Sequence, residues 1–142
     1  MENKITGNDY QVAKKRAKEF YKTIGRLWCP VLNDYVVFNN IGFRHLIRKG
    51  HTLRLLSDQI KRFVLLNSVK HVIANADAKM TCEEKEIAFS LNQKGEKIHI
   101  RSTAKFWKIT TRQGGETVTV VVRQVAFGKK HFFSIYNQKT AR

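Results

Sequence analysis

The sequence predicts an α+β fold, with N-terminal helices packed on a C-terminal antiparallel sheet. Apolar residues in the first half recur at helical spacing, whereas the last third alternates apolar and polar residues and is rich in Val, Thr and aromatic side chains. Helices followed by consecutive strands are typical of this class. With 142 residues, of which 42% are hydrophobic, the chain is expected to form a single domain, residues 1–142.

The first predicted helix carries one apolar stripe. Asn8 or Asp9 is expected to cap its start, and Gly25 is expected to end it. Residues 34–38 then have the β-branched and aromatic composition of a short buried strand. The stripe consists of Tyr10, Ala13, Ala17, Phe20, Tyr21 and Ile24.

Two more helices are predicted before the sheet. Asn39 or Asn40 is expected to cap a short helix over residues 41–49, which Gly50 ends. A longer helix is predicted over residues 57–76, because apolar residues again recur at helical spacing there.

Residues 77–104 carry two different signals. Thr81-Cys82-Glu83-Glu84 matches a capping box, which predicts a helix that runs toward Gly95. Residues 97–101 alternate instead, which predicts a strand.

Three antiparallel strands are predicted to end the chain. They cover residues 105–111, 117–125 and 130–136, with turns at 113–116 and 126–129. Three strands joined by short turns form a meander.

The charge indicates a polyanionic partner. The chain has 27 Lys and Arg residues against 11 Asp and Glu, a net charge of +16. Residues 44–72 hold seven basic residues against one acidic, and residues 101–142 hold nine against one. Self-repulsion of this size destabilises a compact domain unless a partner offsets it, and RNA or another nucleic acid is the expected partner. An anionic lipid surface is the weaker alternative.

We expect a cytoplasmic protein that does not bind membranes. No segment approaches the roughly 18–20 uncharged apolar residues of a membrane span, and the first residues lack the apolar run of a secretory signal. The two cysteines, Cys29 and Cys82, form neither a disulfide framework nor a zinc pattern, which indicates a reducing compartment.

The motif inventory favours chemistry without a metal or cofactor. The sequence has no phosphate-binding GxxxxGK[ST], no GxGxxG after a strand, no HExxH and no CxxC. Carboxylates are scarce in the basic segments, so a carboxylate metal site is not expected there. Cleavage of RNA by its own 2′-hydroxyl suits the remaining residue types. It needs a proton acceptor, a proton donor and cations around the phosphorane.

His45 is the strongest candidate for proton transfer. It lies in residues 44–51 with a second histidine and three Arg and Lys residues, an unusual density for a helix that only packs. A surface or core-edge histidine is the alternative. The residues expected to bind nucleic acid are Arg44, Arg48, Lys49, His51, Lys108 and Lys130.

The last predicted strand offers two hydroxyl groups. Ser134 and Tyr136 are poor core residues because buried hydroxyls need hydrogen-bond partners, so both are expected to face a concave polar site. Arg123 on the preceding strand is a candidate for the same site. Strict alternation places Lys130, Phe132, Ser134 and Tyr136 on one face and His131, Phe133 and Ile135 on the other.

These residues resemble a known family. A helix carrying Arg44-His45, a second helix and a meander ending in Lys130-His131-Phe132-Phe133-Ser134-Ile135-Tyr136 resemble the barnase–EndoU–colicin–RelE superfamily of small ribonucleases, above all its phage-associated branches. The resemblance covers residues 28–138 as a nuclease-like core, and residues 1–27 are expected to be a helical extension. It implies an α+β fold with a four-stranded antiparallel sheet whose face holds the site.

The resemblance also implies roles for single residues. The family's helix histidine falls on His45, and its hydroxyl in the last strand falls on Ser134. Tyr136 lies on the same face, and the family's basic strand residue falls on Arg123. All four are therefore catalytic candidates.

Function remains open between two main classes. The first is a metal-independent endoribonuclease acting on tRNA or another structured RNA. The resemblance implies a toxin or effector of a mobile element or secretion system, with an acidic antitoxin or immunity protein as partner. The second is a non-enzymatic module that binds nucleic acid, and a fainter third is an inhibitor or effector that binds an acidic protein. Clustering of His45 with hydroxyl groups favours the enzyme, because binding alone does not require it.

Overall fold

The computed structural model describes residues 6–139 and has an α+β fold, as predicted. None of its helices is long and apolar enough to cross a membrane. The helices are α1 (Gly7–Ile24), α2 (Asn40–Ile47), α3 (Leu56–Leu65) and α4 (Val69–Ala74), with the 3₁₀ turn η1 (Leu66–Ser68) between the last two. The strands of the main sheet are β1 (Arg26–Cys29), β2 (Asp34–Val37), β5 (Lys79–Gln93), β6 (Glu96–Gln113), β7 (Glu116–Val125) and β8 (His131–Lys139).

The main sheet is mixed, with the strand order β1-β2-β8-β7-β6-β5. Strands β5 to β8 form an antiparallel meander, which confirms the prediction for the end of the chain. The β1–β2 hairpin joins it through a short parallel pairing of β2 with β8 at Val37 and His131. The sheet therefore has two strands more than the family resemblance implies.

The prediction of a helix from Thr81 toward Gly95 is wrong, because these residues belong to β5. Lys94 and Gly95 both have positive φ, 51° and 79°, and they form a tight turn that pairs β5 with β6 along its whole length. Two consecutive residues of this kind match the right-handed twist of a hairpin. The cross-strand pairing overrides the local capping signal.

Helix boundaries also differ from the predictions. Thr6, rather than Asn8 or Asp9, caps α1 by accepting a hydrogen bond from the Asp9 backbone NH at 3.1 Å. Helix α2 ends at Ile47, and Gly50 lies in the turn between the two short strands β3 (Arg48–Lys49) and β4 (Thr52–Leu53). The long helix predicted over residues 57–76 is interrupted by η1.

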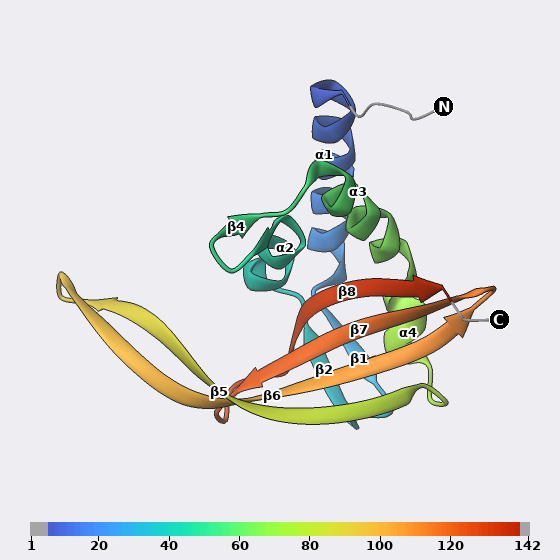
Figure 1. Cartoon of the computed structure of the whole chain (residues 1–142). Coiled ribbons are helices and arrows are strands. Elements are labelled where there is room, and N and C mark those ends of the chain that lie inside the picture. Colours follow the sequence, from blue (N-terminus) through green and yellow to red (C-terminus); the bar gives the residue numbers. More distant parts are fainter. Residues whose placement is uncertain (1–5, 140–142) are drawn as a thin grey trace.

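An aromatic cluster ties the helices to the sheet. The Tyr21 ring of α1 contacts the rings of Phe38, of Phe43 from α2 and of Phe132 from β8, and Phe38 stacks on Phe132, with ring centroids 5.1–5.9 Å apart. Helix α4 packs against β1, β6 and β7. Figure 1 shows α1, α2 and α3 gathered at the β8 side of the sheet.

The outer part of the β5–β6 hairpin stands apart from this body (Figure 1). Strand β7 begins to accompany β6 at Ala104, so residues 87–93 and 96–102 pair only with one another. Most of their side chains are exposed. The core therefore lies at the helix-covered end of the sheet.

Gly42 allows α2 to lie directly on β8. A Cβ atom at this position would come closer than 3.0 Å to the Phe132 carbonyl oxygen, the Phe132 ring and the Tyr21 hydroxyl. Two of these groups belong to buried residues of the core and one is backbone, so none can move aside freely.

Gly42→Ala is accordingly expected to lower the free energy of unfolding by about 1–3 kcal/mol, the usual effect of overpacking a core. Chemical denaturation measures this. Gly7→Ala is the control, because a Cβ atom at Gly7 meets nothing within 4 Å. Equal free energies of unfolding for the two variants would contradict the close approach of α2 to β8.

Candidate functional site

A β-bulge in β8 sets which side chains point away from the core. The register places Phe132 opposite Val122 and Ser134 opposite Val121, so Phe133 is an extra residue between them. Phe132 and Val122 are fully buried in the core. Because the bulge shifts the alternation by one residue, Ser134 lies on the opposite face from Phe132. The expected alternation, which put both on one face, is therefore wrong.

Because of the bulge, side chains before and after it on β8 point to the same face of the sheet. Opposite residues of an antiparallel pair share a face, and His131 lies opposite Arg123 while Tyr136 lies opposite Thr119. Arg123 and Thr119 are four positions apart on β7, so they share a face as well. His131, Ser134 and Tyr136 therefore lie on the same face as Arg123.

Helices α2 and α3 contribute side chains that contact β8 on this face. The His45 ring of α2 lies on the Phe133 ring, with centroids 4.1 Å apart. From α3, Arg62 Nη1 donates to Ser134 Oγ at 2.9 Å and to the Ile135 carbonyl oxygen at 3.0 Å. Arg62 therefore binds both the backbone of β8 and the hydroxyl group of Ser134.

One carboxylate holds two arginines beside the imidazole. Asp58 accepts from Arg54 Nη1 at 3.3 Å and from Arg62 Nε at 3.2 Å. Arg54 also donates from Nε to the His45 carbonyl oxygen at 3.0 Å, and its Nη2 lies 3.5 Å from His45 Nδ1. Asp58 thereby links the two guanidinium groups, and Arg54 is bound directly to α2.

Helix α1 supports this arrangement from behind. The Tyr10 hydroxyl donates to the side-chain oxygen of Gln59, which is fully buried. The Gln59 amide nitrogen donates to the Arg54 carbonyl oxygen at 2.8 Å. The turn that carries Arg54 is thus anchored in the core.

A third arginine reaches the same face from β7. Arg123 Nε donates to His131 Nε2 at 3.0 Å, and its guanidinium carbon lies 4.7 Å from the centroid of the Phe133 ring. Burial, and then the charge of Arg123, lower the pKa of His131 to about 4. His131 is therefore neutral near pH 7 and orients the guanidinium as an acceptor.

The electrostatic environment keeps His45 neutral as well. Burial of the ring is the largest cause that lowers its pKa from 6.5 to about 4, followed by the charges of Arg54, Arg62, Arg123 and Lys49. A guanidinium can only donate, so the contact from Arg54 corresponds to a lone pair on Nδ1 and a proton on Nε2. The basic nitrogen of His45, Nδ1, therefore faces Arg54. We call His45, Arg54, Arg62, Arg123 and Ser134 the His45 cluster.

Two predicted site residues lie near this cluster without joining it. Tyr136 is half-buried and lines a pocket of about 200 Å³ beside Arg62 and Asp58. Lys108 is exposed on the same sheet face, opposite Val121.

Lys49, exposed in β3, is close enough for its charge to lower the pKa of His45, whereas four other predicted binding residues lie elsewhere. Lys130 points to the opposite side of the sheet, where it donates to Asp34 at 2.8 Å and covers the Trp107 ring. Arg44 of α2 and Arg48 of β3 line a pocket together with residues of α1. His51 is exposed in the turn between β3 and β4.

Sequence reasoning missed Arg54, Arg62 and His131. The spacing of four residues between Asp58 and Arg62 on a helix was an available signal, because such pairs contact one another. For His131 the alternation of β8 was misleading: it placed His131 and Ser134 on opposite faces, because alternation alone does not reveal a bulge. Arg54 reaches the site through a loop and a short hairpin that the sequence did not predict.

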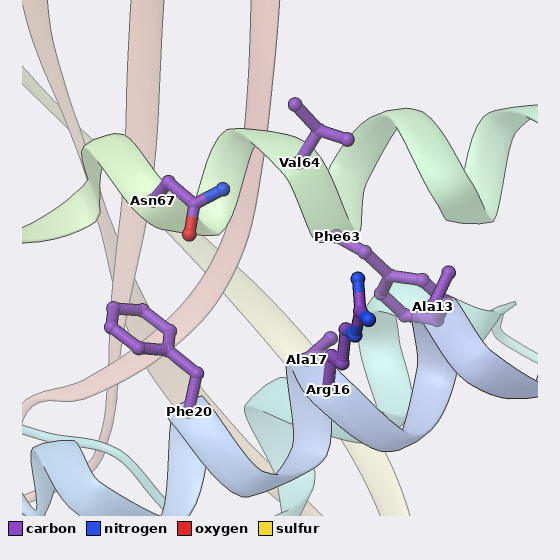
Figure 2. Close-up of a pocket in the computed structure, with 7 residues that line it drawn as sticks. All are labelled: Ala13, Arg16, Ala17, Phe20, Phe63, Val64 and Asn67. Atoms are coloured by element: carbon purple, nitrogen blue, oxygen red, sulfur yellow. The ribbon is translucent and has the colours of Figure 1, made fainter.

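A second pocket, of about 310 Å³, lies between α1 and α3 (Figure 2). Arg16 is the one charged residue among its lining, and none of the His45 cluster takes part. Its walls are mainly apolar side chains such as Phe20 and Phe63, so it offers no groups for acid–base chemistry. Within residues 6–139, no three His, Cys, Asp or Glu side chains come together as a group that could hold a metal ion.

The two neutral histidines predict a specific pH dependence of stability. Both pKa values are near 4 in the folded protein and 6.5 ordinarily, so the unfolded chain binds more protons between these values. Stability is therefore full above pH 6.5 and falls as the pH is lowered through this window, with a slope of up to about two protons.

Urea unfolding at a series of pH values between about 6.5 and 5 measures this slope, since ordinary carboxylates stay ionised there. The double variant His45→Gln/His131→Gln should show a much flatter dependence. A wild-type stability that does not change over this range would contradict the burial of the two rings beside arginines.

No protein-family model, no curated protein and no solved structure matches this chain.

Proposed function

We propose that this protein is a metal-independent endoribonuclease that cleaves RNA through attack of the RNA's own 2′-hydroxyl. The observation that carries the proposal is a neutral imidazole, His45, whose Nδ1 lies 3.5 Å from Arg54 and whose pKa is lowered by the nearby charges of Arg54, Arg62 and Arg123. A phosphodiester seated there meets cations for its charge and a base for the adjacent 2′-hydroxyl. The family resemblance supports the same reaction.

In the proposed step, His45 Nδ1 accepts the proton of the 2′-hydroxyl while O2′ forms a bond to the neighbouring phosphorus. The bond between phosphorus and O5′ breaks, and the departing oxygen takes a proton from water. The products are a 2′,3′-cyclic phosphate and a free 5′-hydroxyl. The reaction consumes no oxidant, reductant or cofactor.

The arginines act on the charge that develops during this step. Arg54, Arg62 and Arg123 provide guanidinium donors that pair with the equatorial oxygens of the phosphorane. A bound phosphate also offsets the positive charges that lower the pKa of His45, so the pKa rises from about 4 when substrate binds. The ring is thus neutral before binding and becomes a stronger base with substrate in place.

Ser134 and Tyr136 have supporting roles in this proposal. Ser134 is a positioning residue, because its hydroxyl oxygen accepts from Arg62 at 2.9 Å. Tyr136 presents a half-buried ring in the adjoining pocket, where a base next to the cleaved phosphate can stack.

The proposed substrate is a cytoplasmic RNA such as a tRNA, in the cell that makes the protein or in a target cell. An acidic antitoxin or immunity protein would suit the positive site face. The alternative is a non-enzymatic module that binds nucleic acid, which the net charge of +16 favours equally. Both functions require RNA binding, and cleavage separates them.

His45→Ala should reduce the rate of RNA cleavage by roughly 10²–10⁴-fold, the usual contribution of a general base, while RNA affinity changes little. Cleavage of labelled RNA in EDTA measures the rate. His71→Ala is the matched control, since His71 is exposed on α4, and it should cleave as the wild type does. A folded His45→Ala protein with full activity would show that the base is another group. If the wild-type protein cleaves no RNA, the nuclease proposal is wrong and the non-enzymatic binding module takes its place.

Ser134→Ala should lower the rate less than His45→Ala, because it removes one hydrogen bond to Arg62 and no proton acceptor. If Ser134 acts through Arg62, then Arg62→Ala and the double variant Arg62→Ala/Ser134→Ala should be equally slow. Single-turnover rates measured under identical conditions test this coupling. Independent, additive losses would count against a positioning role.

A further inference from the structure

A basic groove lies between α1 and α2, on the side of α2 away from the sheet face that carries the His45 cluster. Its volume is about 420 Å³. Five cationic side chains line it and no acidic side chain does; the cations are Lys14, Lys18, Lys22, Arg44 and Arg48. We call this the α1–α2 groove.

The spacing of these cations follows the helices. Lys14, Lys18 and Lys22 recur every four residues, so they form one line along α1, and eight residues of helix span about 12 Å. On the other side of the groove, Arg44 lies on α2 and Arg48 directly follows this helix, at the start of β3. The row of positive charges along α1 is longer than a single phosphate group. It matches several consecutive phosphates of a nucleic-acid backbone.

None of the five cations forms an ion pair with a carboxylate in the described part of the chain. By contrast, Arg54, Arg62 and Lys130 are each paired with an aspartate. Like charges four residues apart on a helix repel one another, as the three lysines of α1 do, and Arg44 and Arg48 add two positive charges across the groove. Repulsion of this kind is relieved when an anion enters.

We infer that the α1–α2 groove binds the sugar–phosphate backbone of RNA beyond the cleaved bond. Helix α2 separates the groove from the His45 cluster and contributes to both, with Arg44 on one side and His45 on the other. One strand that crosses α2 therefore contacts both sites. The inference rests on the proposed function for the identity of the ligand, and it adds α1 to the substrate-binding surface.

Binding to RNA that cannot be cleaved tests the groove separately from catalysis. The probe is a 2′-O-methyl oligouridine, and the groove variant is Lys14→Gln/Lys18→Gln/Lys22→Gln. Each phosphate contact on a single strand contributes about 0.7 to the slope of log affinity against log salt, so losing three should reduce that slope by about two. The matched control is Lys79→Gln/Lys94→Gln/Lys97→Gln, which removes the same charge from exposed positions on β5, the hairpin turn and β6. It should keep a slope close to that of the wild type.

Cleavage then distinguishes failure of the inference from failure of the proposed function. With a dinucleotide, which is too short to span α2, the groove variant should cleave as fast as the wild type, whereas KM for long RNA should rise. Groove-dependent binding by a wild-type protein that cleaves nothing supports the groove and overturns the nuclease. An unchanged salt slope in the groove variant overturns the inference. So does groove-dependent binding to vesicles of anionic phospholipid without any to RNA.

Discussion

The contact between α2 and β8 at Gly42 is the constraint on which the candidate site depends. Without a side chain at this position, α2 lies directly against the Phe132 carbonyl, and this closeness sets the next turn of the helix over Phe133. The imidazole of His45 then lies against the Phe133 ring, which shields it on that side from water. Burial is the largest cause of its lowered pKa, so backbone packing determines the protonation of the histidine. A shift of α2 away from the strand would hydrate the ring.

The same site also brings three arginines close together, and a single carboxylate offsets their positive charges only in part. Asp58 forms ion pairs with both Arg54 and Arg62. Arg123 has no carboxylate partner among the ion pairs of the described residues; it donates a hydrogen bond to neutral His131 and lies over the Phe133 ring. Desolvated cations with incomplete compensation are costly to a folded domain. Their retention on one face, beside a neutral base, fits a site whose electrostatic balance is completed by an anionic ligand.

Local patterns in the sequence were sufficient for the meander, because β7 and β8 carry alternation and β-propensity over most of their length. They failed where distant residues decide. The capping box at Thr81 was locally valid, yet pairing of β5 with β6 outweighed it. The bulge at Phe133 has no signature in the chain, so the faces of β8 were assigned wrongly beyond it. Arg62 acts on Ser134 across 72 positions, a contact that only the folded protein defines.

The projecting end of the β5–β6 hairpin has a consequence for how the protein opens. From Ile87 to Ser102 the ribbon has two strands and no third neighbour, and a two-stranded hairpin is marginally stable in water. We expect its amide hydrogens to exchange with solvent through local fraying from the Gly95 turn, and those at the centre of β7 to exchange only when the whole domain unfolds. We therefore expect the hairpin end to open and close without unfolding of the helix-covered body.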